Sequence, residues 1–219
     1  MSGGFDYQVV IKNIPFLWQG LQLTFLLTFL AICGGILGGT LLALGRLSRF
    51  VPLSLAAGSY VNFFRSMPLI LVIFWFYFLV PFIVGQPVGG FYSVLIAFIL
   101  FEAAYYCEII RAGISSVGHG QVAAGRALGL NYGQIMRYVV LPQAFRNMIP
   151  VLLTQAIVLF QDTSLVYVVG LHDFLVNGDI VANRDNRLIE MYTTVAVVYF
   201  VLCLAGSLGV RRLQRKYAL

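Results

Sequence analysis

The sequence is poor in charged residues and in the residues that build catalytic and metal centres. Only 10% of its residues are charged, and it contains two histidines and three cysteines. Cys33, Cys107 and Cys203 stand singly within apolar runs, so the sequence predicts neither a disulfide framework nor a metal site. It has no GxxxxGKS/T phosphate-binding loop and no nucleophile–base arrangement on a polar scaffold. We therefore expect that this chain is not an enzyme and binds no cofactor of its own.

Apolar residues dominate instead. They make up 60% of the chain, and the mean hydropathy is +0.91, far above that of ordinary soluble domains. Windows of about twenty apolar residues predict five membrane-spanning helices. We place these spans at residues 18–45, 54–82, 91–112, 148–171 and 191–210. The sequence thus predicts an all-α integral membrane protein in which residues 1–219 form a single transmembrane domain.

Basic residues cluster after the first, third and fifth predicted spans. Because positively charged loops stay in the cytoplasm, we expect a periplasmic N-terminus and a cytoplasmic C-terminus. The net charge of +6 then reflects membrane topology, and we expect no nucleic-acid partner. The clustered residues are Arg46, Arg49, Arg111, Arg126, Arg137, Arg146, Arg211, Arg212, Arg215 and Lys216.

Glycines in the first predicted span permit close contact with another helix. Gly34 and Gly38 have the GxxxG spacing, and Gly35 and Gly39 stand beside them. The spacing leaves open whether this contact lies within the subunit or between subunits.

Four ionisable residues that fall inside the predicted spans need a partner or a wet cavity, because an unpaired charge there costs several kcal/mol: Arg65, Glu102, Glu108 and Asp162. Glu102 and Asp162 come near the middle of their spans, the depth at which transporters bind substrates. Glu108 and Arg111 are three residues apart, so we expect an ion pair within the helix. Arg65 comes three residues before Pro68, where we expect a kink. It could reach the membrane surface, pair with an acid or bind a substrate carboxylate.

The fourth predicted span carries a polar face. Residues seven apart share one side of a helix, so the polar side chains of this span fall on a single stripe. The stripe predicts either a hydrogen-bonded contact between helices or one wall of a translocation path. Its members are Thr154, Gln155, Gln161 and Asp162.

The longest polar interval lies at residues 118–142, between the third and fourth spans. Residues 121–127 are good helix formers, Gly129 stands where a helix would end, and residues 132–140 resume a helical pattern that we expect to end before Pro142. We expect two short helices with exposed or half-exposed apolar side chains. Such a pair suits either a groove on another protein or the membrane surface. These side chains belong to Ala124, Leu128, Leu130, Ile135 and Met136.

The same interval resembles the EAA loop of ABC importer permeases. That loop reads Glu-Ala-Ala, three residues, Gly, nine residues, then Ile-any-Leu-Pro, and here the corresponding segments are 123–125, Gly129 and 139–142. Ala123 replaces the usual Glu, so the contact of that Glu is not carried over. The resemblance implies that a separate ATPase couples to this loop. The coupling residues it implies are Ala123, Ala124, Gly125, Arg126, Gly129, Arg137, Leu141 and Pro142.

Three further segments, residues 61–81, 101–117 and 141–170, look like the polar amino-acid permeases, most of all those that import glutamate and aspartate. This resemblance covers nearly the whole chain. It implies a type I ABC importer at the bacterial inner membrane that works by alternating access. It also implies as partners two ATPase subunits, which bind ATP and Mg, a homologous second permease, and a periplasmic amino-acid-binding protein.

The resemblance further implies that residues 162–165 lie near the substrate path. Two rival functions compete with that of an ABC importer. One is an ion-coupled secondary carrier in which Glu102 and Asp162 accept protons, and the other is a membrane scaffold or enzyme subunit that transports nothing. The EAA-like loop argues against both rivals. The residues expected along the substrate path are Arg65, Glu102, Gln155, Gln161, Asp162, Thr163 and Ser164.

Overall fold

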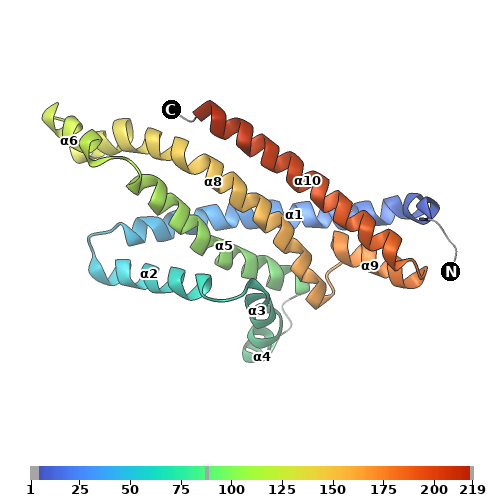
Figure 1. The fold of residues 1–219 in the computed structure, drawn as a ribbon. Helices are drawn as coiled ribbons and strands as arrows, with labels where there is room; N and C mark the ends of the chain where they lie inside the picture. The colour runs from blue at the N-terminus through green and yellow to red at the C-terminus, as the bar shows by residue number, and fades with distance from the viewer. Residues whose placement is uncertain (1–4, 87–88, 218–219) are drawn as a thin grey trace. The chain divides into compact units, whose positions relative to one another are not determined.

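The computed structural model describes residues 5–86 and 89–217, and within these ranges every regular element is a helix (Figure 1). The all-α prediction is therefore confirmed. The elements, in chain order, are α1 (Tyr7–Arg46), α2 (Val51–Arg65), α3 (Leu69–Phe74), the π-helix η1 (Trp75–Leu79), α4 (Val80–Val84), α5 (Gly90–Ser115), α6 (His119–Ala127), α7 (Tyr132–Ile135), the π-helix η2 (Met136–Val140), α8 (Leu141–Asp162), the 3-10 helix η3 (Thr163–Val169), α9 (Phe174–Arg184) and α10 (Leu188–Tyr217).

Four helices of the described chain are long and apolar enough to cross a membrane, and a fifth span is counted if one bent pair crosses as a unit. This agrees with the prediction of about five spans. The four are Tyr7–Arg46, Gly90–Ser115, Tyr132–Val169 and Leu188–Arg215, and the bent pair is Val51–Arg65 with Leu69–Val84.

The kink expected at Pro68 is a complete break between two helices. Helix α2 ends at Arg65, and Pro68 adopts an extended conformation, with φ −64° and ψ 135°, before α3 begins. Proline lacks an N–H group and disfavours helical dihedrals in the residue before it. Both effects end α2 here.

Two other prolines, Pro81 and Pro142, each follow a π-helix with one residue between, inside a continuous run of helix. The Leu141 N–H donates to the Met136 carbonyl five residues back, and Pro142 follows. Pro81 follows η1 in the same way. The wider π turn makes room for a ring that would clash with a carbonyl in a regular α-helix. The expectation that the helix ends before Pro142 is therefore wrong, because η2 continues directly into α8.

The chain divides into two compact units. The expectation of a single transmembrane domain stays a prediction. The first unit comprises residues 1–32, 68–98 and 156–208, and the second comprises residues 33–67, 99–155 and 209–219.

In the first unit, helix α9 lies beside the N-terminal half of α1 (Figure 1), and two hydrogen bonds join them. The Phe174 N–H donates to Thr24 Oγ1 at 3.2 Å, and Asn177 Nδ2 donates to the Phe16 carbonyl at 2.8 Å. Gly20 allows this approach, since a Cβ there would lie 2.4 Å from the Asp173 carbonyl oxygen. An apolar core packs around the contact. Its buried members are Leu17, Leu21, Phe160, Phe174, Val181, Ala182, Met191, Val195 and Cys203.

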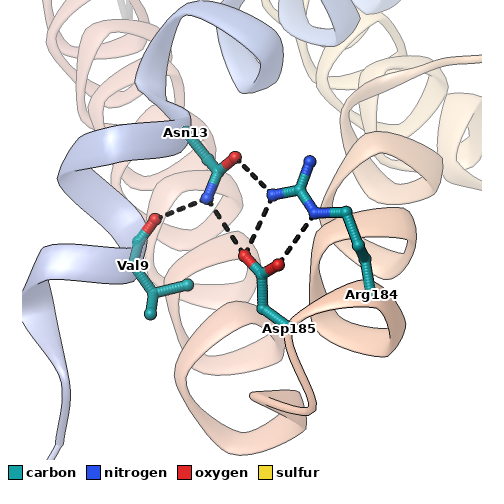
Figure 2. A network of polar contacts seen from close by, with 4 residues as sticks. All are labelled: Val9, Asn13, Arg184 and Asp185. Atoms are coloured by element: carbon teal, nitrogen blue, oxygen red, sulfur yellow. Dashed lines mark hydrogen bonds and ion pairs between the residues drawn. The ribbon is translucent and has the colours of Figure 1, made fainter.

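A polar network also ties α1 to the turn after α9 (Figure 2). Asn13 Nδ2 donates to the Val9 carbonyl at 2.8 Å and to Asp185 Oδ2 at 3.4 Å. Arg184 donates to Asn13 Oδ1 and to both Asp185 oxygens at 2.8 to 2.9 Å. The hydrogen bond from Arg184 lowers the pKa of Asp185 below its usual value. The network holds the N-terminal part of α1 in register with α9.

In the second unit, the glycines of α1 pack directly against α5. A Cβ at Gly35 would lie 2.9 Å from Glu102 Cβ, and one at Gly39 would lie 2.6 Å from Tyr106 Cβ and 2.9 Å from the Cys107 nitrogen. The GxxxG contact, left open by the sequence, is thus an interface within the subunit.

Candidate substrate path and coupling hairpin

Glu102 lies on α5, within the second unit, and is completely buried. Gln155 on α8 donates its side-chain N–H groups to both Glu102 carboxylate oxygens, at 3.1 and 3.2 Å. Gly35 on α1 also packs against the Glu102 side chain. Two residues expected along the substrate path are thus brought together, in a hydrogen-bonded contact between helices.

The other polar residues of α8 have separate surroundings. Thr154 donates to the Pro150 carbonyl of its own helix at 2.9 Å. Gln161 is exposed and Asp162, the last residue of α8, is half-buried. Both belong to the first unit, whereas Gln155 belongs to the second. Their role in the path stays a prediction.

Thr163 and Ser164 begin the 3-10 helix that follows α8. The Thr163 hydroxyl donates to the Phe160 carbonyl at 2.7 Å, and the Ser164 hydroxyl donates to the Gln161 carbonyl at 2.8 Å. Each hydroxyl reaches back three residues, so both bonds tighten the end of α8. Thr163 is buried and Ser164 is half-buried.

Glu108, six residues after Glu102 on α5, pairs with two arginines. Arg111 donates to Glu108 Oε2 at 2.8 and 3.2 Å, which confirms the predicted ion pair within the helix. Arg46, the last residue of α1, pairs with Glu108 Oε1. No sequence pattern indicates this second partner, because Arg46 lies on another helix, far from Glu108 in the sequence.

Arg65 ends α2 with its side chain exposed. The guanidinium carbon lies 5.5 Å from the centre of the Tyr105 ring, which is cation–π geometry. Within residues 5–86 and 89–217, no carboxylate lies within 4.0 Å of the Arg65 guanidinium. The described residues therefore do not support the interpretation that Arg65 pairs with an acid.

Arg65 and Glu108 both line an open pocket of 460 Å³ within the second unit. Polar side chains missed by sequence reasoning complete its wall: Asn147 Nδ2 donates to Ser116 Oγ at 2.8 Å. In the sequence, Ser116 follows the third predicted span and Asn147 directly precedes the fourth, and no other pattern marks them. The lining residues are Arg65, Glu108, Ile109, Ala112, Gly113, Ser116, Asn147, Met148 and Val151.

Residues 118–142 form the expected helical hairpin, built by two turn motifs. Gly129, with φ +78°, ends α6: its N–H donates to the Arg126 carbonyl, and the Leu130 N–H donates to the Gly125 carbonyl. This is a Schellman motif, which favours glycine at the left-handed position. Asn131 and Gln134 then form a capping box that starts α7, with both bonds at 2.9 Å.

The inner face of this hairpin is tightly packed. A Cβ at the buried Gly125 would lie only 3.0 Å from Ile135 Cγ1. Ile135 is only 2% exposed, so the expectation that it is exposed is wrong: the turn folds α7 back onto α6. Ile135 joins a core that also anchors the hairpin to α5 and α8, with buried members Val117, Ile135, Val140, Ala144 and Met148.

The outer face of the hairpin presents the remaining coupling candidates. Leu128, at its tip, is 80% exposed, and Leu141 is half-buried. Leu130 and Met136 are half-buried, as expected. The exposed coupling candidates are Ala123, Ala124, Arg126, Gly129, Arg137 and Pro142.

Comparisons with known proteins agree with this architecture. Residues 35–219 match the family described as binding-protein-dependent transport system inner membrane component. The glutamate/aspartate import permease protein GltK of Escherichia coli O6:H1 is 47% identical over 98% of this chain and 99% of its own length. The arginine transport system permease protein ArtQ of Bacillus subtilis strain 168 is 33% identical over 96% of each chain.

A solved structure gives the same result. The crystal structure of an amino acid ABC transporter with histidines contains a chain that superimposes with a TM-score of 0.93 and 34% identity, covering 99% of this chain and 100% of that one. An inward-facing structure of the MetNI methionine ABC transporter, at 22% identity and a TM-score of 0.75, shares the fold.

Proposed function

The chain belongs to the family of binding-protein-dependent transport system inner membrane components and is a permease subunit of an amino-acid ABC importer, and from this we propose its substrate and mechanism. We propose that it imports glutamate and aspartate. The observation that carries this proposal is the 47% identity to a glutamate/aspartate import permease over 98% of the chain, against 33% and 34% for relatives named for arginine and glutamine.

The working transporter contains further subunits. Since this chain has no phosphate-binding loop, two separate ATPase subunits bind ATP and Mg and supply the energy. Five spans enclose a path poorly, so a second permease, related or identical, forms the opposite wall. A periplasmic binding protein delivers the amino acid to the side that carries the N-terminus, and the C-terminus is cytoplasmic.

The hairpin at residues 118–142 is where an ATPase docks. Its inner face is packed, and its apolar tip, Leu128, is 80% exposed, as expected of a helix that inserts into a groove on a partner. Ala123 stands in the place of the usual Glu, so docking depends on shape, on the turn at Gly129 and on Arg126 and Arg137.

Alternating access follows from this attachment. ATPase closure moves the hairpin, and the movement passes to α8 because the helix is continuous through Pro142. It passes to α5 through the shared core around Met148 and Ile135. The path opens toward the binding protein, and ATP hydrolysis resets it toward the cytoplasm. The residues proposed to act in transport along this path are Arg65, Glu102, Gln155 and residues 161–164.

Uptake into membrane vesicles tests the proposal. With the ATPase and the binding protein present, vesicles should accumulate radiolabelled L-glutamate and L-aspartate only when ATP is supplied, and a protonophore should have no direct effect. Uptake driven by a proton gradient without ATP would support the secondary carrier instead. Uptake of arginine or glutamine but not of glutamate would overturn the substrate while keeping the transporter class.

The docking site is tested at Gly129. Replacement by Val strains the left-handed turn, because a β-branched residue disfavours φ +78°. The variant should reach the membrane in normal amounts but lose ATP-dependent uptake by at least about tenfold. The matched control is Gly209→Val on α10, where nothing lies within 4 Å of a new Cβ. Normal uptake by Gly129→Val would contradict the proposed docking.

A further inference from the structure

Another pocket of the second unit is lined almost entirely by apolar side chains. It has a volume of 180 Å³ and lies among residues 36–47, at the C-terminal end of α1, residues 110–114 of α5 and residues 141–152 of α8. Among its described lining residues Thr40 alone is polar, and the Thr40 hydroxyl donates to the Ile36 carbonyl of its own helix at 2.7 Å. A buried water needs two to four polar partners, whereas an apolar cavity of about 150 Å³ stays dry and binds a hydrocarbon such as benzene. The pocket is therefore suited to a hydrocarbon ligand.

The pocket is lined on one side by buried residues and on the other by exposed ones. Ala43 and Met148 are buried, whereas Leu44 and Phe145 are exposed. Both α1 and the segment that contains α8 are long and apolar enough to cross a membrane. Exposed leucine and phenylalanine side chains on such helices are stable in hydrocarbon and not in water. A ligand therefore enters this pocket from the bilayer.

The depth of the pocket matches one leaflet of a bilayer. Residues 36–47 extend about 16 Å along the axis of α1, at a rise of about 1.5 Å per residue. The hydrocarbon core of a bilayer is about 30 Å thick, so one leaflet contributes about 15 Å. Leu47 comes directly after the end of α1, on the side proposed to be cytoplasmic. An acyl chain of the cytoplasmic leaflet has the length and the chemistry to fill the pocket.

The second unit carries an excess of positive charge. Its three segments contain eleven arginine and lysine residues but only two acidic residues, Glu102 and Glu108. Glu102 is completely buried, and Glu108 is paired with Arg46 and Arg111. Basic pockets between membrane helices on the cytoplasmic side bind the headgroups of anionic lipids. The charge therefore favours an anionic lipid over a zwitterionic one.

Two of these arginines come next to lining residues in the chain. Arg49 is two residues after Leu47, at most about 7 Å along the chain, and Arg146 directly follows Phe145. Both arginines are exposed, and no carboxylate of residues 5–86 and 89–217 lies within 4.0 Å of either guanidinium group. An unpaired guanidinium group binds a phosphate in bidentate geometry.

We infer that this pocket binds one acyl chain of an anionic phospholipid of the cytoplasmic leaflet, and that Arg49 and Arg146 bind the phosphate group of that lipid. The acyl chain fills the space between α1 and the first half of α8. It contacts Met148, which also belongs to the core that anchors the hairpin. The site goes beyond the proposed function, because it takes a lipid and does not depend on which amino acid is carried.

Lipid binding to the purified transporter tests this inference. The complex in detergent, without ATP, amino acid or binding protein, is titrated with dioleoylphosphatidylglycerol or with dioleoylphosphatidylcholine, and native mass spectrometry measures the bound lipid. The two lipids have the same acyl chains and differ in net charge. Wild type should bind the anionic lipid at its tightest site at least about tenfold more tightly, because two arginines attract it. Replacing both arginines, Arg49→Gln with Arg146→Gln, should lower the affinity for phosphatidylglycerol to that for phosphatidylcholine.

The pocket itself is tested by Ala43→Leu. The larger side chain occupies the cavity, so the affinity for both lipids should fall by at least about tenfold, and thermal unfolding in detergent checks that the variant is folded. The matched controls are Ala205→Leu, an exposed alanine of α10, and the double replacement Arg211→Gln with Arg212→Gln, two exposed arginines outside the pocket. Both controls should bind the lipids like wild type.

Three results would overturn the inference. They are equal affinity of wild type for the two lipids, an unchanged preference for phosphatidylglycerol in the Arg49 and Arg146 variant, and unchanged lipid binding in folded Ala43→Leu. The last result would show that another part of the transporter covers the pocket. None of these measurements involves uptake of an amino acid, so a failure of the lipid site and a failure of the proposed function are distinguishable.

Discussion

Glu102 and Glu108 stand six residues apart on α5, and the protein stabilises them by different means. Glu102 is completely buried and accepts hydrogen bonds from the neutral amide of Gln155. The Glu108 side chain is 18% exposed and pairs with Arg46 and Arg111. The stability of the fold at position 102 therefore depends on shape and hydrogen bonding, whereas at position 108 it depends on charge.

The largest effect should come from removing the charge at position 108. Glu108→Gln leaves the partly buried Arg46 guanidinium without its anion. Breaking a buried pair costs about 3 to 5 kcal/mol and losing an exposed pair costs at most about 1 kcal/mol, so we expect the unfolding free energy to fall by about 2 to 3 kcal/mol. Thermal unfolding of the purified permease in detergent, followed by tryptophan fluorescence, measures this loss.

The matched variant is Glu102→Gln. Glutamine keeps the volume of glutamate, and its oxygen can still accept from Gln155, so the unfolding free energy should change by less than about 1 kcal/mol. Equal losses of unfolding free energy in Glu102→Gln and Glu108→Gln would contradict this distinction between the two positions.

The next effect concerns the close packing of α1 on this part of α5. In Gly39→Ala, the new methyl group would lie 2.6 Å from Tyr106 Cβ and 2.9 Å from the Cys107 backbone nitrogen, so the helices must separate. We expect the free energy of unfolding, measured by thermal unfolding, to fall by about 2 kcal/mol. Gly209→Ala makes the same change in a helix where nothing lies within 4 Å, and should be neutral or slightly stabilising. A loss of the same size at both positions would show that α1 does not depend on this contact.

The smallest effect extends the comparison to a buried carboxylate of the first unit. Asp173 caps α9 by accepting from the Val176 N–H at 2.8 Å, and burial raises its pKa to about 6 while that bond opposes the shift. The folded state then binds more protons than the unfolded state between about pH 4 and 6, so its stability falls as pH rises through this window.

Asp173→Asn removes the charge and can retain the cap. It should therefore stabilise the protein by about 1 to 2 kcal/mol at pH 7.5 and change little at pH 4. Unfolding measured at both values tests this. A variant that is less stable than wild type at pH 7.5 would show that the charged form of Asp173 is favoured by its surroundings.

Local patterns in the sequence predicted local structure well. The turn at Gly129 and the break at Pro68 both follow from backbone sterics that act within a few residues. The same kind of reasoning failed at Pro142, because a π-helix can accommodate a proline that would end a regular helix. It also failed at Ile135, whose burial depends on how the turn folds α7 back onto Gly125.

The candidate site was less predictable, because its contacts join segments distant in sequence. Glu102 and Gln155 were each recognised as polar residues within a span, but their pairing depends on the packing of α5 on α8. Arg46 and Asn147 gave no signal of their own, since their positions near Glu108 and Ser116 follow only from the tertiary structure. The hairpin, in contrast, was predicted from the residue spacing that resembles the EAA loop, and not from any single contact.

The claim that an ATPase docks on this hairpin is tested most directly at its tip. Leu128 is 80% exposed, so Leu128→Asp should leave the melting temperature of the permease unchanged while it removes the apolar contact with the partner. The control is Ile189→Asp at the start of α10, an apolar residue of similar exposure, 76%, on the expected periplasmic side.

The measurement is the amount of ATPase that co-purifies with a tagged permease. The account predicts at least about a tenfold loss for Leu128→Asp and none for Ile189→Asp. Full recovery of the ATPase with Leu128→Asp would contradict it.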